Sequence, residues 1–134
     1  LVYFSGTSWS AISTGAALPT GKGLHAIWGT PDAKTIFAVG DGGTIVRFRD
    51  GTWTQISQYD PSKADLYDMS GYGNQVVAVG PQGTVLRADP PYDTFVPQGG
   101  GPSGLNLRGL SCSSKGICWV GGSFGYLGYL DLRP

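Results

Sequence analysis

The segment Ala38-Val39-Gly40-Asp41-Gly42-Gly43-Thr44-Ile45-Val46-Arg47 is the most informative part of the sequence, because its parts recur along the chain in one order. Val-Gly returns at 79–80 and 120–121, and Gly-Thr-Val-Leu-Arg at 83–87 matches Gly-Thr-Ile-Val-Arg at 43–47. Upstream, 24–27, 66–69 and 107–110 each begin with Leu, and the Trp-x-x-Ile-Ser phrase of 9–13 recurs at 53–57. An ordered repeat with a period of about 41 residues indicates a stack of similar structural units.

Each period divides into four short runs with β-strand composition. In the clearest unit they are 24–28, 35–39, 44–49 and 52–57, separated by turn sequences such as Asp41-Gly42-Gly43 and Asp50-Gly51. Four antiparallel strands in about 41 residues are typical of a β-propeller blade. A β-sandwich uses strands of similar length but does not repeat its sequence four strands at a time. The sequence therefore predicts an all-β propeller fold.

The repeat also predicts the organisation of residues 1–134 as one propeller segment of roughly three blades. We expect a blade remnant at 1–23, blades at 24–65 and 66–106, and a partial blade at 107–134. A propeller ring usually holds four to eight blades, so a three-blade arc would leave apolar blade faces uncovered. Two arrangements cover them: the segment is part of a longer chain, or a second copy closes a six-bladed ring as a homo-oligomer.

The composition also limits the expected secondary structure and the possible partners. Gly accounts for 23 of 134 residues, and all nine acidic residues are Asp, so Glu, a good helix former, is absent. The net charge is zero without a basic run, which disfavours nucleic acid as a partner. The sequence has no apolar run of the roughly 20 residues that a membrane-spanning helix requires.

Three phrases carry a resemblance to known propellers: Ala38–Ile45, Asp50-Gly51-Thr52-Trp53 and 24–29. They resemble bacterial propeller repeats of the Ycf48-like type, and the Trp-Gly-containing units are similar to repeats of myxobacterial surface proteins. Asp50-Gly51-Thr52-Trp53 is also similar to the Asp-box (BNR) hairpin of sialidases, without the Ser that opens that motif. The resemblance implies a secreted, periplasmic or cell-surface protein. It says little about activity, because propellers host many unrelated functions.

The two cysteines are expected to form a disulfide. Cys112 and Cys118 flank a five-residue turn between two expected strands, so their Cα atoms can lie at disulfide distance. Secreted proteins of the similar group often carry a Cys pair in this place. A zinc site is not expected, because no third Cys and no nearby His complete four ligands. A disulfide indicates an oxidising compartment.

No catalytic constellation is evident. His25 is the only histidine, and no Ser has the surroundings of a nucleophile elbow. The Tyr–Glu pair of sialidases cannot be built from these residues, because Glu is missing. Most Asp residues lie in turn sequences, where Asp bonds to its own backbone. We therefore expect no enzyme activity, no metal and no cofactor in this segment.

Two groups of residues are candidates for binding a ligand. His25, Tyr67 and Arg108 hold equivalent places in the first strand of successive units, which lines the central channel of a propeller. Trp28, Tyr59 and Tyr92 lie in or near loops that join strands and could stack on a sugar or a peptide. Packing within or between the blades is the alternative for each of them.

These observations favour a non-catalytic, extracytoplasmic protein-interaction or assembly scaffold. The alternative is a carbohydrate-binding, lectin-like propeller module related to sialidases, suggested by the loop aromatics and the Asp-box similarity. An enzyme with its active residues in other blades is a third possibility. The expected partner is accordingly a protein or a glycan.

Overall fold

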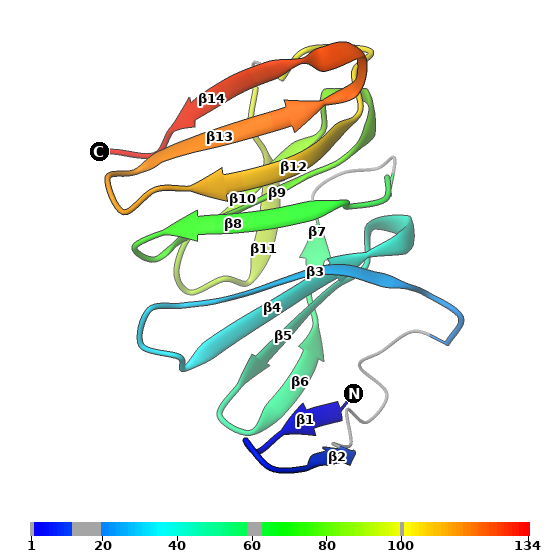
Figure 1. Cartoon of the computed structure of the whole chain (residues 1–134), viewed down its shortest axis with the longest axis vertical. Helices are drawn as coiled ribbons and strands as arrows, with labels where there is room; N and C mark the ends of the chain where they lie inside the picture. Colours follow the sequence, from blue (N-terminus) through cyan, green and yellow to red (C-terminus); the bar gives the residue numbers. More distant parts are fainter. Residues whose placement is uncertain (1, 12–19, 59–62, 100) are drawn as a thin grey trace.

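The protein consists of small antiparallel sheets that lie flank to flank in sequence order, from the blue N-terminal hairpin to the red C-terminal sheet (Figure 1). The structure is a computed structural model and describes residues 2–11, 20–58, 63–99 and 101–134. In this part of the chain no helix is long and apolar enough to cross a membrane. The sheets confirm the predicted all-β propeller of four-stranded antiparallel blades, about three in number.

The first complete sheet follows the repeat closely. Its order is β3-β4-β5-β6, and every neighbouring pair is antiparallel. The strands are β3 (Leu24–Gly29), β4 (Thr35–Gly40), β5 (Ile45–Arg49) and β6 (Thr52–Gln55). The expected strands at 24–28, 35–39 and 44–49 agree with these bounds to within one residue. A short hairpin, β1 (Val2–Phe4) with β2 (Trp9–Ala11), precedes this sheet.

The second sheet has a fifth strand that belongs to the preceding unit. Its order is β8-β9-β10-β11-β7, with β7 parallel to β11 and the other pairs antiparallel. The strands are β7 (Ser57–Gln58), β8 (Asp68–Tyr72), β9 (Gln75–Val79), β10 (Val85–Ala88) and β11 (Thr94–Pro97). The expected strand 52–57 therefore divides at Ile56, and its last part crosses to the outer edge of the next sheet. Sequence periodicity gave no sign of this crossing.

The third sheet has three strands in the order β12-β13-β14. They are β12 (Leu107–Cys112), β13 (Ile117–Gly122) and β14 (Leu127–Asp131). Cys112 and Cys118 face each other across β12 and β13 and form a disulfide, with their Cα atoms 3.8 Å apart.

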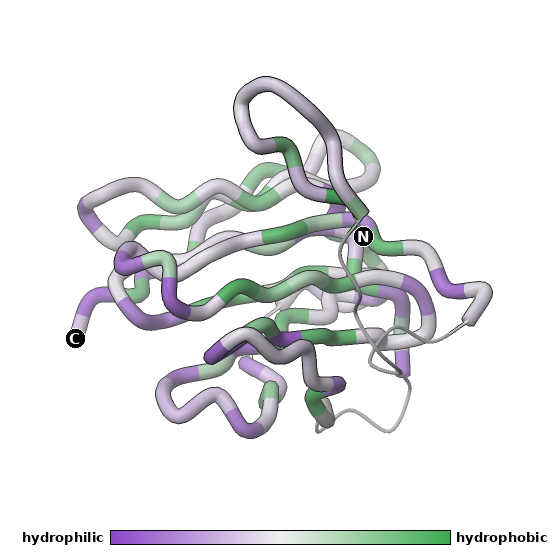
Figure 2. The backbone as a smooth tube through the Cα atoms, turned by 90° about the horizontal axis from the view of Figure 1, so that it is seen from below, coloured by the Kyte–Doolittle hydropathy of each residue, from purple (hydrophilic) through white to green (hydrophobic). Residues whose placement is uncertain are grey.

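The core lies between the sheets. One buried cluster joins β4 and β5 to β8–β11 and contains Phe37, Val39, Ile45, Leu66, Val76 and Phe95, among others. A second cluster joins β9 and β10 to β12 and β13 and contains Val77, Val79, Val85, Leu107, Leu110 and Val120, among others. Figure 2 shows this pattern, with hydrophobic colour along the strands and hydrophilic colour at many of the turns. The interfaces between blades are thus the hydrophobic core of the protein.

One detail of the repeat alignment is wrong. The sequence pairs Val120-Gly121 with Val39-Gly40, but in the structure Gly122 takes the place of Gly40. Leu24 lies opposite Gly40 and Leu107 opposite Gly122. The N–H of Gly40 donates to Thr44 O, and that of Gly122 makes the same bond to Tyr126 O. At this point the alignment of the repeat by sequence therefore differs by one residue from its alignment by structure.

Candidate functional site

The first strands of the three sheets, β3, β8 and β12, lie side by side (Figure 1). A β-bulge occurs at the start of two of them. Leu24 opposes Gly40 and Ala26 opposes Val39, so His25 is the extra residue of β3. Arg108 is the extra residue of β12 in the same way. Bulges often re-aim a side chain, and these two act on equivalent positions of the repeat.

Tyr67 holds the corresponding place directly before β8. Its N–H donates to Val79 O at 2.8 Å, while the next residue, Asp68, lies opposite Val79. His25, Tyr67 and Arg108, which we call the inner rim, therefore come from one position of the repeat in three successive blades. The structure brings together all three residues that the sequence predicted along the channel.

The three side chains of the inner rim lie in a row, with Tyr67 between His25 and Arg108. The His25 and Tyr67 ring centroids are 6.3 Å apart. The Arg108 guanidinium carbon lies 4.9 Å from the centroid of the Tyr67 ring, which is a cation–π distance. Arg108 is exposed, and among the described residues it has no carboxylate partner. Its N–H groups are therefore available to an external acceptor.

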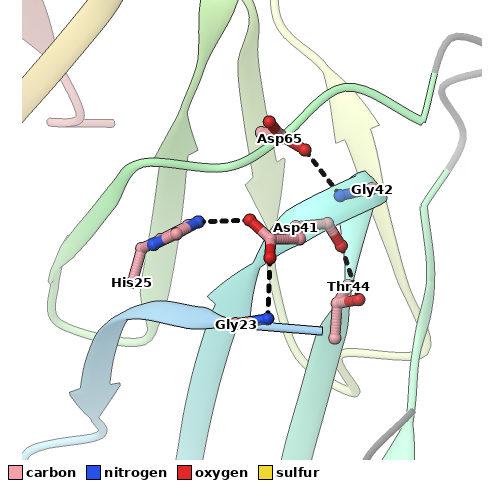
Figure 3. Close-up of polar contacts among 6 residues, drawn as sticks. All are labelled: Gly23, His25, Asp41, Gly42, Thr44 and Asp65. Atoms are coloured by element: carbon pink, nitrogen blue, oxygen red, sulfur yellow. Dashed lines mark hydrogen bonds and ion pairs between the residues drawn. The ribbon is translucent and has the colours of Figure 1, made fainter. Parts of the chain in front are cut away.

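His25 is held by a carboxylate. Asp41, in the short 3-10 turn Asp41–Gly43 after β4, lies 2.7 Å from His25 Nε2 and accepts the Gly23 N–H at 2.7 Å (Figure 3). The backbone N–H of Gly23 first, and the His25 ring second, hold the pKa of Asp41 below its usual value. Asp41 therefore stays ionised and restrains one end of the inner rim.

The role of Asp41 has a parallel in the third sheet. Ser123 takes the place of Asp41, and its Oγ accepts the N–H of Asn106, the residue that corresponds to Gly23. In both sheets a second hydrogen bond joins the same two residues in the opposite direction. The Asp41 N–H donates to Gly23 O, and the Ser123 N–H donates to Asn106 O. Asp41 therefore has a structural role, which is to hold the start of the first strand of its sheet, as Ser123 does in the third sheet.

Asp65 and Asn106, the residues that correspond to Gly23 in the second and third units, also connect neighbouring blades. Asp65 Oδ1 accepts the Gly42 N–H at 2.7 Å (Figure 3), and Asn106 Oδ1 accepts the Gln82 N–H at 3.4 Å. These bonds hold the chain before β8 and β12 against the turn of the preceding blade.

Beside His25 the surface is hollow and mostly apolar. An open cavity of about 230 Å³ is lined by Leu24, His25, Ala26, Ile27 and Ala38. A ligand at this end of the inner rim would meet an apolar wall next to an imidazole.

The structure places the predicted loop aromatics differently from the inner rim. Tyr92 is 5 % exposed, packs edge-on against Phe37, and donates its hydroxyl to Asn74 O at 2.6 Å. Burial raises the pKa of the Tyr92 phenol. Trp28 is half-buried and packs against the core between the first two sheets. Tyr59 lies outside the described residues. Stacking of these rings on a ligand stays a prediction, and the packing of Tyr92 and Trp28 does not support it.

Sequence reasoning missed the contacts that Asp68 and the arginines of β5 make between blades. Asp68 Oδ2 accepts the Leu110 N–H of the next blade at 2.7 Å. Arg47 donates to Pro91 O and Tyr92 O of the next blade, and Arg49 also donates to Pro91 O. Because these side chains are polar, the sequence alone does not distinguish a contact between blades from exposure to solvent. Within the described residues, no group of three His, Cys, Asp or Glu side chains could hold a metal ion.

Comparison with solved structures supports the fold. The chain is similar to YCF48 from Cyanidioschyzon merolae, with a TM-score of 0.72 and 19% identity over 85% of this chain and 38% of that protein. It is also similar to a candidate 6-phosphogluconolactonase from Bacteroides uniformis, with a TM-score of 0.55 and 12% identity over 93% of this chain and 47% of that protein. The chain thus spans less than half the length of either protein. No protein-family model matches the sequence. No curated protein matches it either.

Proposed function

We propose that this chain belongs to a non-catalytic, extracytoplasmic β-propeller that binds a protein partner through the inner rim. One observation carries the proposal. A single repeat position supplies three different side chains, His25, Tyr67 and Arg108, that contact one another across three blades. Neighbouring positions such as Leu66 and Asp68 are used for packing and for bonds between blades, whereas these three side chains lie together in one row.

The chemistry of the inner rim suits an acidic group on the partner. A guanidinium presents a planar fork of N–H donors that matches a carboxylate. Stacking on Tyr67 holds the guanidinium of Arg108 in place, which reduces the side-chain entropy lost on binding. The apolar cavity beside His25 would take a neighbouring aliphatic side chain. The ligand we propose is a peptide segment with an Asp or Glu side chain next to an apolar residue.

A binding role accounts for the His25–Asp41 pair better than catalysis does. A Ser–His–Asp arrangement needs a nucleophile on the second imidazole nitrogen. No hydroxyl of the described residues hydrogen-bonds to that nitrogen. Asp41 already has a structural task at Gly23, as Ser123 has at Asn106.

The proposed location rests on the disulfide. Cys112 and Cys118 are the only cysteines of the chain, and they are bonded to each other. Stable disulfides of this kind are typical of secreted, periplasmic and cell-surface proteins and rare in the cytosol.

The test uses the single histidine as a reporter. Its imidazole ¹⁵N resonances and the Nε–Hε resonance of Arg108 would be followed during titration with capped hexapeptides. One peptide carries Asp beside Leu, and the other carries Asn in its place. We expect saturable shifts of both resonances with the Asp peptide. Arg108→Gln should weaken binding about tenfold or more, because a hydrogen bond to a charged group contributes about 1.5–3 kcal/mol.

Lys115→Gln is the matched control, since it removes an exposed cation from the turn after β12 rather than from the inner rim. Equal shifts with the Asn peptide, or unchanged affinity in Arg108→Gln, would contradict the proposal. If the chain shows saturable and sugar-specific binding on a glycan array, and Arg108→Gln loses it, the ligand of the inner rim is a glycan rather than a peptide.

A further inference from the structure

The two oxygens of the Asp41 carboxylate have different partners. Oδ2 accepts the Gly23 N–H at 2.7 Å, and Oδ1 lies 2.7 Å from His25 Nε2 (Figure 3). The first bond holds the start of β3, a task that Ser123 performs in the third sheet with a single oxygen. The bond to His25 is therefore additional to this structural role, and it acts on a residue of the inner rim.

This bond determines which nitrogen of the His25 ring carries the proton. The Gly23 N–H and then the His25 ring hold the pKa of Asp41 below its usual value, so the carboxylate is ionised and can only accept. Nε2 must therefore donate, and in a neutral imidazole a proton on Nε2 leaves Nδ1 as a hydrogen-bond acceptor. Turning the ring over would place a carbon atom against Asp41, so the same bond also fixes the orientation of the ring.

The second nitrogen of the His25 ring is open to a ligand. Within the parts of the chain that the structure describes, no group is hydrogen-bonded to Nδ1, and the side chain is 37% exposed. The two ring nitrogens lie on opposite sides of Cε1, so Nδ1 points away from Asp41. The inner rim therefore has an acceptor at the His25 end and the donors of Arg108 at the other end, with the Tyr67 ring between them.

We propose that Asp41 acts through His25 as a positioning residue, and that it makes the inner rim select a peptide with a hydroxyl donor as well as an acidic group. The inference rests on the proposed function and adds the second polar group of its ligand. A Ser or Thr hydroxyl donates to His25 Nδ1 while the carboxylate binds Arg108.

The spacing of the two ends suits an extended peptide. Alternate side chains of such a peptide lie roughly 7 Å apart and point to the same side. A ligand of the form Asp-Leu-Ser therefore directs its carboxylate and its hydroxyl to one side, and the two groups can reach across the Tyr67 ring to both ends of the inner rim.

The preference for a donor should depend on pH, because protonation turns Nδ1 into a donor. Histidine ordinarily changes charge between about pH 5 and 8, and His25 is the only histidine of the chain. Both nitrogens of the protonated ring donate, so a hydroxyl and an ether oxygen are then equally acceptable. The charged and titratable groups around this part of the inner rim are Lys22, Asp41, Asp65, Tyr67, Asp68 and Arg108.

The first measurement needs no ligand. A two-bond ¹H–¹⁵N correlation spectrum of the imidazole at about pH 8 reports which nitrogen is protonated. We expect the proton on Nε2 in the unmodified chain. Asp41→Asn keeps an oxygen for the Gly23 N–H but turns an amide N–H₂ toward the ring, so the proton should move to Nδ1. Asp65→Asn is the matched control, since it changes a carboxylate at the same turn that does not contact His25.

The second measurement compares three capped hexapeptides that contain Asp-Leu-Ser, Asp-Leu-Ala or Asp-Leu-(O-methyl-Ser). Their affinities come from the shifts of the Arg108 Nε–Hε resonance. At about pH 8 the Ser peptide should bind about two- to tenfold more tightly than the other two, as expected for one hydrogen bond between neutral groups. The O-methyl-Ser peptide should bind as well as the Ser peptide at about pH 5, and also in Asp41→Asn at the higher pH.

The outcomes separate this inference from the proposed function. If the Asp-Leu-Ala peptide binds and the Ser peptide binds no better, the inference is overturned and the proposed function stands. If none of the peptides binds, the proposed function fails and the inference fails with it. A proton on Nδ1 in the unmodified chain at about pH 8, or a preference for Ser that persists in Asp41→Asn, would overturn the role of Asp41 whatever the affinities are.

Discussion

Phe37 of β4 and Trp119 of β13 occupy the same position of the repeat, yet Phe37 is fully buried and Trp119 is 53% exposed. Phe37 lies opposite Trp28 and Arg47, and Trp119 lies opposite Ser111 and Tyr129 in the same register. The difference comes from the neighbouring blade rather than from the strand itself. Tyr92 and Phe95 cover Phe37 with centroids 5.1 and 5.7 Å away, whereas Trp119 contacts Tyr129 of its own sheet at 5.8 Å.

Alanine at these two positions should therefore have unequal effects on stability. Phe37→Ala removes a ring from the core and should lower the free energy of unfolding by about 3–5 kcal/mol. Trp119→Ala should change it by about 1 kcal/mol or less, since about half of this side chain is exposed and its ring contacts Tyr129 of the same sheet. Urea denaturation followed by circular dichroism measures both. A loss at Trp119 as large as that at Phe37 would show that its face is covered in solution.

The contrast also shows what could be predicted from the sequence. The four-strand unit was evident because Leu24, Leu66 and Leu107 recur at nearly constant spacing, as do the Gly-Thr pairs at 43–44 and 83–84. Hydrophobic pattern identifies which residues face a sheet interface. It does not tell whether a neighbour covers that interface, so Phe37 and Trp119 have the same signature.

The inner rim was predictable for a related reason. Strand equivalence alone aligned His25, Tyr67 and Arg108, and it required no knowledge of the bulges that aim them. Tyr92 could not be assigned in the same way. It follows two prolines in a turn sequence, and its burial depends on Phe37 of another blade, 55 positions earlier in the chain. A contact between residues so far apart in the chain does not affect the local periodicity of the sequence, so the sequence does not reveal it.

Asp68 should prove to be a principal connection between the second and third blades. Its carboxylate accepts the N–H of Met69 at 2.8 Å and that of Leu110 at 2.7 Å. Asp68→Ala leaves the Leu110 N–H without its acceptor, so we expect a loss of about 1–3 kcal/mol. Hydrogen exchange at Leu110 should accelerate more than exchange within β4. The exposed Asp93, which has only a long contact of 3.6 Å to Arg47, serves as the control through Asp93→Ala. Equal losses in the two variants would contradict this role.

Asp131 and Arg133 should make a small contribution to stability that depends on pH. Hydrogen bonds from the Arg133 side chain, and then from its backbone N–H, lower the pKa of Asp131 from 3.8 to about 2. A carboxyl group whose pKa is lower in the folded state stabilises the fold above its unfolded pKa. That contribution is lost as the pH falls from 3.8 toward 2. Both side chains are largely exposed, so the effect should diminish in high salt.

The measurement is the urea midpoint at neutral pH and at about pH 2, where the Asp131 contribution is largely lost. Asp131→Asn should reduce the difference between the two values more than Arg133→Gln does, because the backbone N–H of residue 133 still donates to Asp131 when the Arg133 side chain is replaced. If the effect of Asp131→Asn is undiminished in the Arg133→Gln background, the Arg133 side chain does not contribute and the prediction is wrong.

Phe124 lies in a backbone conformation that favours glycine. It is the middle residue of the 3-10 turn Ser123–Gly125, with φ of 57° and an exposed fraction of 94%. The corresponding residue of the first sheet is Gly42, with φ of 58°. Phe124→Gly should therefore raise the free energy of unfolding by about 0.5–1 kcal/mol, because it relieves the left-handed strain and removes no buried contact.

Phe124→Ala is the matched control for this change. It removes the ring but keeps a Cβ in the left-handed region, so its stability should stay close to that of the unmodified chain. The reverse change, Gly42→Ala, should be destabilising, since it places a Cβ on a residue with φ of 58°. If Phe124→Gly and Phe124→Ala both destabilise the chain, the ring itself contributes to folding. The stabilisation lost with the ring would then exceed the relief of backbone strain at this turn.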